Sequence, residues 1–223
     1  MNAAVAHIET IADLLEQLGD IDPRRVRLQP TPGTATEEDL LKVYARSKRP
    51  CELVDGTLVE KVMGLYESRL AIALSFFIEL YLDHHNRGFT AGEAGMMRLH
   101  EGLVRSPDLS FVSWDQLPRR RIPRKPIPSL YPDLAVEVLS KSNTKKEMDR
   151  KLREYFLAGT KLVWYIDPDK RTVRVFTSAS DSTLLHEKDT LDGGAVLPGF
   201  RLSIWELFAR AERSAPPRSE KKS

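Results

Sequence analysis

The chain contains little cysteine and no long apolar run, and each absence excludes a class of protein. Its single cysteine, Cys51, excludes an intramolecular disulfide and any metal site built from several cysteines. No apolar run approaches the roughly 18 residues that a membrane-spanning helix needs. The beginning, MNAAVAHIETIADLLEQL, lacks the basic and apolar regions of a signal peptide. We therefore expect a soluble, cytoplasmic protein with no membrane association.

The chain also has little net charge. Its 34 basic and 32 acidic side chains leave a formal charge of +2, which by itself indicates no particular partner. Any nucleic-acid surface must therefore be local. With 223 residues, 41% of them hydrophobic, the chain is long enough for one domain with a substantial core.

The sequence pattern divides the chain into three parts. Apolar residues at helical spacing over 8–18 predict an amphipathic helix, and the proline- and arginine-rich stretch after it predicts an irregular linker. We assign residues 1–33 to this N-terminal helix and linker, and residues 34–210 to the main domain. The polar, proline-containing end, residues 211–223, is typical of a disordered tail.

Within the main domain, helices alternate with strands. The segment 67–83 is apolar over so wide an arc that its helix should cover a sheet face. Asp55-Gly56 between two alternating runs predicts a hairpin over 51–62. This alternation favours a mixed α/β sheet over a bundle or a barrel. The other expected elements are helices at 37–47 and 145–158, and strands around 101–102, at 109–113, at 133–140 and on both sides of the turn in 161–177.

A basic loop separates two of these strands. In PRRRIPRKPIPSLYP, residues 118–132, the prolines prevent regular structure. Basic loops are more often simply solvated, but we expect phosphate contacts here if DNA is the substrate. The five crowded basic residues are Arg119, Arg120, Arg121, Arg124 and Lys125.

Glu137 raises a question because it lies within AVEVL, which otherwise has the pattern of a buried strand. An ionised carboxylate in an apolar interior costs several kcal/mol unless a cation meets it. Asp133 shares its face of the strand, and Asp108 opens another strand after a proline, so we expect two or three carboxylates to converge. Such oxygens suit Mg²⁺ or Mn²⁺, and the implied chemistry is phosphodiester hydrolysis.

A structural interpretation stands beside this one. A Pro-Asp pair often only opens a strand or a turn. Glu137 could equally form a buried ion pair with a nearby lysine or arginine.

Three lysines are candidates for the cation that orients a water or offsets charge on a phosphate. Lys141 would lie roughly 13 Å from Glu137 along an extended strand, which is too far for one metal site. Lys151 flanks the apolar stripe of the following helix, which must face the sheet, and Lys145 flanks it further toward the N-terminus. A lysine beside a buried stripe usually only extends to water.

Several separated segments together resemble one family. From about residue 34 to 210 the chain resembles the Uma family of putative restriction endonucleases, members of the PD-(D/E)XK nuclease superfamily. The resemblance implies a restriction-endonuclease-like α/β core, a mixed sheet flanked by helices, with Mg²⁺ or Mn²⁺ at the carboxylate cluster. The segments that carry it are ELVDGTLVEKVMG, LVRSPDLSFVSWDQLP and PDLAVEVLSKSNTKKEMDRKLREYFLAGTKLVWYIDPDKRTVRVF.

The resemblance also implies roles for individual residues. The aspartate of the family's Pro-Asp matches Asp108, and its strand glutamate matches Glu137. The superfamily has a lysine two positions after that glutamate, where this chain has Leu139. The resemblance implies that the lysine has moved to the next helix, as Lys151. Glu67 would be a further metal ligand, although a glutamate in a first helical turn also favours the helix electrostatically.

The resulting hypothesis is a metal-dependent endonuclease of DNA. Asp108 and Glu137 would hold the metal, and Lys151 would position a water for attack on phosphorus. Cutting both strands of a duplex makes a homodimer attractive. The main alternative is a catalytically inactive DNA-binding or assembly protein that kept the fold, because Leu139 also fits a lost activity. A third possibility is a hydrolase of small phosphate esters.

Overall fold

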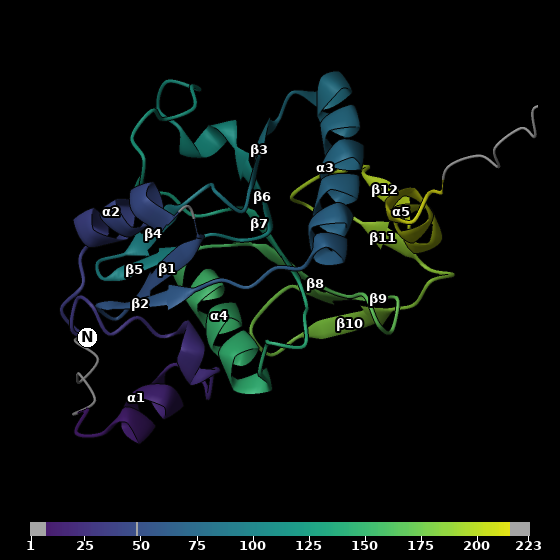
Figure 1. Cartoon of the computed structure of the whole chain (residues 1–223). Coiled ribbons are helices and arrows are strands. Elements are labelled where there is room, and N and C mark those ends of the chain that lie inside the picture. The colour runs from purple at the N-terminus through teal and green to yellow at the C-terminus, as the bar shows by residue number, and fades with distance from the viewer. Residues whose placement is uncertain (1–7, 48, 215–223) are drawn as a thin grey trace, which may run out of the picture.

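The structure is a computed structural model that describes residues 8–47 and 49–214. At its centre β7 runs parallel to β8, and the other neighbouring strands of the same sheet run antiparallel, in the order β10-β9-β8-β7-β6-β3 (Figure 1). This six-stranded sheet confirms the predicted mixed sheet. Its strands are β3 (Gly88–Gly92), β6 (Leu109–Ser113), β7 (Leu134–Val138), β8 (Leu162–Asp167), β9 (Thr172–Phe176) and β10 (Ser182–Leu185).

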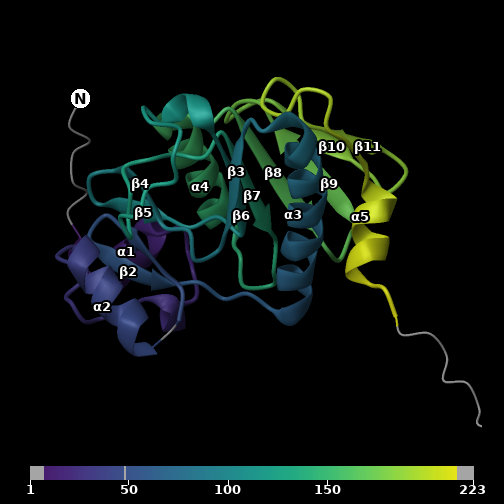
Figure 2. The ribbon, with the colours of Figure 1, turned by 90° about the horizontal axis from the view of Figure 1, so that it is seen from above.

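Helices cover both faces of this sheet. Helices α3 (Leu65–His85) and α5 (Ile204–Ala211) pack on one face, and α4 (Lys145–Ala158) packs on the other (Figure 2). Alternate residues of β7 supply both cores: Leu134 and Val136 pack toward α3, whereas Ala135 packs toward α4. The wide apolar arc predicted for α3 is therefore explained by the sheet beneath it.

A second, four-stranded sheet lies beside the first. Its strands are β1 (Cys51–Val54), β2 (Thr57–Glu60), β4 (Met97–His100) and β5 (Leu103–Arg105), in the order β2-β1-β5-β4. The predicted hairpin is confirmed, with Asp55 and Gly56 both at positive φ, as its two-residue turn requires. Helix α2 (Glu37–Ser47) packs on this sheet, and α4 contacts both sheets.

The described part of the N-terminal segment packs into the fold. Helix α1 (Ile11–Gln17) begins after Thr10, whose side chain forms a capping box with Asp13. Leu14 and Leu18 are buried against the second sheet. The boundary at residue 33 stays a prediction, but this segment contributes directly to the molecule's interior.

The C-terminal part adds elements that the sequence pattern did not indicate. Strands β11 (Thr190–Asp192) and β12 (Arg201–Ser203) pair with each other, and α5 follows. The expected tail, 211–223, lies outside the described residues from 215 onward. Across residues 8–47 and 49–214, no helix is both long and apolar enough to cross a membrane.

Candidate active site

The register of β6 and β7 brings Asp108 beside Glu137. Leu109 pairs with Val136 in this antiparallel ladder, so the residue before β6 lies next to the residue after Val136. The backbone N–H of Val138 donates to Asp108 Oδ2 at 2.7 Å. Both carboxylates are buried and line a cavity of about 20 Å³. That volume holds about one water molecule or one ion.

A lysine meets each of the two carboxylates. Lys151 Nζ lies 3.2 Å and 3.3 Å from the two oxygens of Glu137, and its side chain is 2% exposed. Lys61 Nζ lies 2.8 Å from Asp108 Oδ1 and also donates to the carbonyl of Ser106. The structure therefore places Lys151 where the resemblance implied it, and adds a second lysine that sequence reasoning missed.

The other two candidate lysines lie outside the cavity. Lys145 pairs with Asp149, and its side chain is 88% exposed. Lys141 lines a larger groove of about 960 Å³ that adjoins the cavity. Lys151 does not extend to water, because α4 packs against both sheets. Its Nζ lies 3.5 Å from Oε2 of Glu52 on β1.

Tyr155 completes the surroundings of Glu137. Its hydroxyl donates to Glu137 Oε1 at 2.5 Å, and its ring lies in the apolar cluster of α4. Burial raises the pKa of Glu137 above its usual range, although Lys151 and Lys61 act in the opposite direction. Burial and the adjacent Glu137 carboxylate likewise raise the pKa of Tyr155, so its hydroxyl remains a proton donor.

A buried ion network lies behind Lys151. Arg105 Nη1 lies 2.6 Å from Glu52 Oε2, and Arg105 Nε donates to Glu154 at 2.8 Å. Burial alone would raise the pKa of Glu52, but Lys151 and Arg105 hold it well below its usual range. Glu52 is therefore an ionised carboxylate that, like Glu137, pairs with the ammonium of Lys151.

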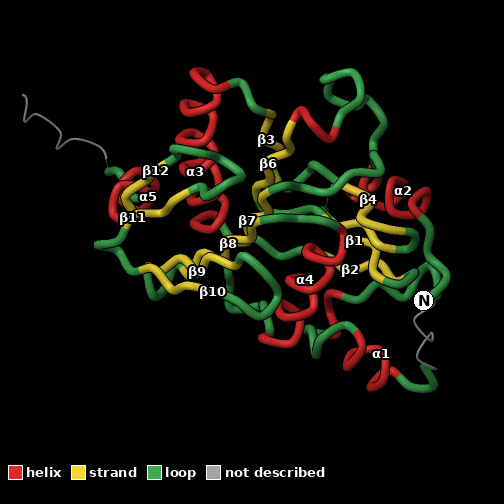
Figure 3. Tube along the Cα trace, turned by 180° about the vertical axis from the view of Figure 1, so that it is seen from behind, coloured by secondary structure: helices red, strands yellow, loops and turns green. Residues whose placement is uncertain are grey.

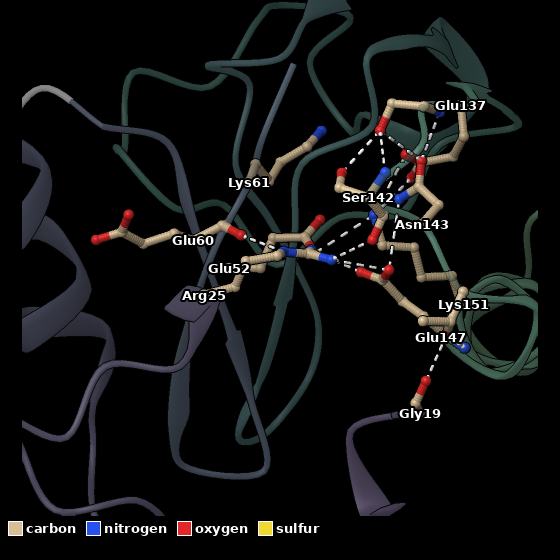
Figure 4. Close-up of polar contacts among 12 residues, drawn as sticks. Gly19, Arg25, Glu52, Glu60, Lys61, Glu137, Ser142, Asn143, Glu147 and Lys151 are labelled. Carbon is tan, nitrogen blue, oxygen red and sulfur yellow. Dashed lines mark hydrogen bonds and ion pairs between the residues drawn. The ribbon is translucent and has the colours of Figure 1, made fainter. Parts of the chain in front are cut away.

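The N-terminal segment supplies one wall of the cavity through Arg25 (Figure 4). Its guanidinium binds both oxygens of Glu147 at 2.7 Å and 2.9 Å, and its Nε donates to the carbonyl of Glu60. The Thr144 side chain accepts from the backbone N–H of Glu147 and thereby caps the start of α4. The carboxylate of Glu147, however, turns to Arg25 instead of back to the helix start.

The expectation that Asp133 joins the cluster is wrong. Asp133 binds Lys161 and accepts from the backbone of Ser113, at the opposite end of β7 from Glu137. Although it shares a strand face with Glu137, four residues of extended chain separate the two by roughly 13 Å. The converging carboxylate comes from the neighbouring strand instead.

Glu67 lies near the start of α3, where the sequence placed it. It lines the large groove and not the small cavity. A Cβ added at Gly64, the N-cap, would lie 2.2 Å from Glu67 Oε2, so this carboxylate turns against the beginning of its own helix. Its part in binding a metal stays a prediction.

The five basic residues of the loop, Arg119, Arg120, Arg121, Arg124 and Lys125, are all exposed. After a short helical turn, the connection between β6 and β7 continues as a loop, drawn green in Figure 3. Its end lies beside β4, where the backbone N–H of Arg98 donates to the carbonyl of Pro128. Arg120 pairs with Asp115 and lines a separate cavity of about 280 Å³. None of the five lines the cavity of Asp108 and Glu137.

The donor set fits a small divalent ion. In the part of the chain that the structure describes, no three acidic, histidine or cysteine side chains form a metal site by themselves. Mg²⁺ does not require three, because it typically takes one or two carboxylates and completes its shell with waters and substrate phosphate. Asp108 and Glu137 provide two carboxylates beside a cavity of the right size.

Comparisons with known proteins place the chain in a family. The family model described as "Putative restriction endonuclease", that of the Uma2 family, matches residues 37–205. The chain belongs to the Uma2 family. This agrees with the resemblance expected from the sequence segments, and the family is one of nucleases by its description.

A solved structure shares the fold. The crystal structure of a putative nuclease belonging to DUF820 from Anabaena variabilis ATCC 29413 matches with a TM-score of 0.68 and 20% identity. The match covers 79% of this chain and 98% of the other. It shows that this member of the Uma2 family has a nuclease fold, a mixed sheet flanked by helices. No curated protein matches the chain.

Proposed function

We propose that the chain is a metal-dependent endonuclease that hydrolyses phosphodiester bonds of DNA. The observation that carries the proposal is the pairing of two buried carboxylates, Asp108 and Glu137, with two buried lysines around a cavity the size of one ion. Desolvation of each of these charges opposes folding, and such charged clusters beside a cavity are found preferentially at functional sites.

The cavity is lined by two carboxylates, those of Asp108 and Glu137, together with Lys61, Lys151 and Arg25. Glu52 is paired with Arg105 as well as with Lys151, so the carboxylates of this cluster are matched by cations and a divalent ion would have to share their oxygens with the two lysines. Asp108 and Glu137 would hold Mg²⁺ or Mn²⁺, which would polarise the phosphate and lower the pKa of a bound water.

The chain's own residues supply the remaining functions. Glu52 and Glu137 hold the Lys151 ammonium between them, where it can orient the attacking water and offset charge that develops on the phosphate. Tyr155 fixes one oxygen of Glu137. Lys61 restrains Asp108 in the same way. The reacting groups are thus pre-organised by side chains that have almost no freedom to move.

The position of Lys151 also favours an enzyme over an inactive relative. Leu139, at the superfamily's lysine position, packs against the apolar cluster of α4. An ammonium group nevertheless lies beside Glu137, because Lys151 of α4 supplies it. We therefore propose that the departure from the superfamily pattern is a relocation of the charge, which supports an active enzyme.

The large groove is the proposed path of the nucleic acid. Val62 and Asn143 line both the groove and the small cavity, so a strand in the groove would reach the carboxylates. Lys141 and Arg174 lie along it and provide phosphate contacts. We retain the loop 119–125 as a second proposed contact and a homodimer as the proposed assembly for cutting both strands.

Cleavage of supercoiled plasmid by the purified protein, with Mg²⁺, Mn²⁺ or EDTA, tests the proposal. We expect metal-dependent nicking or linearisation, and a loss of roughly 1000-fold or more in Glu137→Ala and Lys151→Ala. Lys145→Ala is the matched control, because this lysine lies on the same helix but outside the cavity.

Full metal-dependent cleavage by folded Glu137→Ala would refute the site. If the original chain does not cut DNA either, the result supports the alternative of an inactive DNA-binding protein. Calorimetric titration with Mn²⁺ then decides whether the carboxylates bind metal. Cleavage of small phosphate esters without cleavage of DNA would favour the third possibility.

A further inference from the structure

Helix α3 lies on the outside of the six-stranded sheet (Figure 2). It carries a row of exposed apolar side chains on its outer face. Leu65, Ile72, Phe76 and Leu80 are 85%, 56%, 42% and 49% exposed, respectively. They follow one another at intervals of seven, four and four residues, so they lie along one side of the helix. The opposite side of the same helix packs on the six-stranded sheet.

No side chain among residues 8–47 and 49–214 buries this row. Arg210 of α5 lies over the ring of Phe76, 3.3 Å from its centroid, and still leaves it partly exposed. The last residues of the chain, APPRSEKKS, contain no large apolar side chain that would match the row. A contiguous apolar row of this length on a surface helix is typical of an interaction site.

Two residues of opposite charge flank Phe76 at equal spacing along this face, and the guanidinium of Arg210 lies over its ring. Asp83 is exposed, whereas Arg69 is half-buried and also donates to the carbonyl of Arg210 at 3.4 Å. Ile72 and Leu80 lie four residues on either side of Phe76, and Arg69 and Asp83 lie seven residues on either side. All five residues fall on one side of the helix. In an antiparallel pair of α3 helices with a two-fold axis at Phe76, each Arg69 therefore meets Asp83 of the other copy, and each Ile72 meets Leu80.

We propose that this face of α3 is the interface of a homodimer in which two copies of α3 pack antiparallel about Phe76. Such an isologous contact is self-complementary: the apolar centre is shared, and the pair of opposite charges forms twice. The charge pattern of this face is therefore complementary to the same face on a second copy of the chain.

The interface also borders the candidate active site, and in this respect the inference rests on the proposed function. Ile72 lines a cavity of about 350 Å³ that Asp108 lines as well. At a rise of 1.5 Å per residue, the N-terminal ends of the two α3 helices would lie roughly 33 Å apart. One turn of B-form DNA spans roughly the same distance, so both sites could engage one duplex.

Sedimentation equilibrium of the whole chain, without DNA or metal, tests the interface. We expect twice the mass of one chain, and a dimer dissociation constant at least about 30-fold higher for Phe76→Glu, as for the loss of a central interface residue. Leu157→Glu is the matched control, because Leu157 is an 85% exposed leucine on α4 and lies outside the row. A monomer at about 100 µM, or a dimer that Phe76→Glu leaves unchanged, would overturn the proposal.

If Phe76→Glu fails to fold, exchanging the charges of Arg69 and Asp83 tests the same interface. Arg69→Glu and Asp83→Arg should each weaken the dimer, and the double variant should restore it. Within one chain these residues lie roughly 21 Å apart along the helix, so only a contact between copies can produce the rescue. Absence of rescue would refute the antiparallel arrangement. A dimer that does not cleave DNA would contradict the proposed function and leave this inference intact.

Discussion

Glu137 is stable inside an apolar strand because of the three side chains around it. Lys151 offsets its charge, and Tyr155 donates a hydrogen bond to it. The positive charge of Lys61, which is paired with the neighbouring Asp108, also favours the ionised form of Glu137. Burial nevertheless raises its pKa, so the ionised form of this carboxylate lowers the stability of the folded chain. Perturbed pKa values cluster at functional sites, and structural ion networks also produce them.

The residue-scale prediction concerns the pH dependence of cleavage. A metal ligand must be ionised, so the rate should rise with pH through the raised pKa of Glu137. Tyr155→Phe removes a hydrogen bond that favours the ionised form, which raises this pKa further. We expect the acid limb of the pH–rate profile to move upward by on the order of one pH unit.

Tyr165→Phe is the control for this measurement. Its hydroxyl is also buried but donates to the carbonyl of Met148 instead of to Glu137. Its acid limb should coincide with that of the original chain. An unmoved limb in Tyr155→Phe would show that Glu137 does not govern the rate, or that Tyr155 does not act on it.

At the scale of elements, α4 joins all parts of the site. It presents Lys151 and Tyr155 to the main sheet, Glu154 to the second sheet and Glu147 to the N-terminal segment. Charged side chains therefore occupy a helix face that a simple amphipathic pattern would leave in water. The contact with Arg25 ties the N-terminal segment, which precedes the family match, to the site.

We predict that Arg25→Ala lowers the free energy of unfolding by about 3 kcal/mol, because it leaves the Glu147 carboxylate buried without its partner. Urea titration at neutral pH measures this. Arg24→Ala is the matched control: its side chain is 89% exposed and should contribute little. Equal midpoints for the two variants would contradict the structural role of Arg25.

The same pair predicts an acid dependence of stability. Burial opposes ionisation of Glu147, but Arg25 and Lys151 hold its pKa below the usual value of 4.5. A lowered folded-state pKa contributes stability that is present above pH 4.5 and is lost as the pH falls toward the folded-state pKa. The original chain should therefore lose more stability than Arg25→Ala over that range, in urea titrations at several pH values.

At the scale of the whole molecule, the site lies where three parts of the fold meet. The six-stranded sheet supplies the carboxylates, the second sheet supplies Glu52 and Arg105, and the N-terminal segment supplies Arg25. The large groove begins at this junction. The basic loop is separate from it, so any contact of the loop with DNA must involve a duplex that extends beyond the groove.

A binding experiment over a range of salt concentrations tests the loop. Replacement of its five basic residues, Arg119, Arg120, Arg121, Arg124 and Lys125, by glutamine should weaken binding and reduce the salt slope by roughly 1 for each phosphate that the loop no longer neutralises. Lys188→Gln with Arg201→Gln, two exposed positions in the C-terminal part, is the control. An unchanged slope in the loop variant would refute its role.

The sequence by itself determined the helices α2, α3 and α4, the hairpin at Asp55-Gly56 and the family. These depend on local signals: alternation, turn residues and the spacing of apolar positions. The anomaly of Glu137 was also visible, because a charge in an apolar run is a local feature. Its lysine was found through the family resemblance and the stripe of α4, since both are patterns along the chain.

Only the tertiary structure decided which other side chains meet it. Glu52 lies in an alternating strand, where its face is expected to be exposed, and it is buried because α4 packs on that face. Lys61 follows the hairpin, and no sequence pattern marks it as a site residue. The prediction that Asp133 joins the cluster was wrong because Asp133 and Glu137 lie at opposite ends of the same strand. Contacts between residues far apart in sequence depend on how sheets and helices pack, and no local period of the chain encodes that packing.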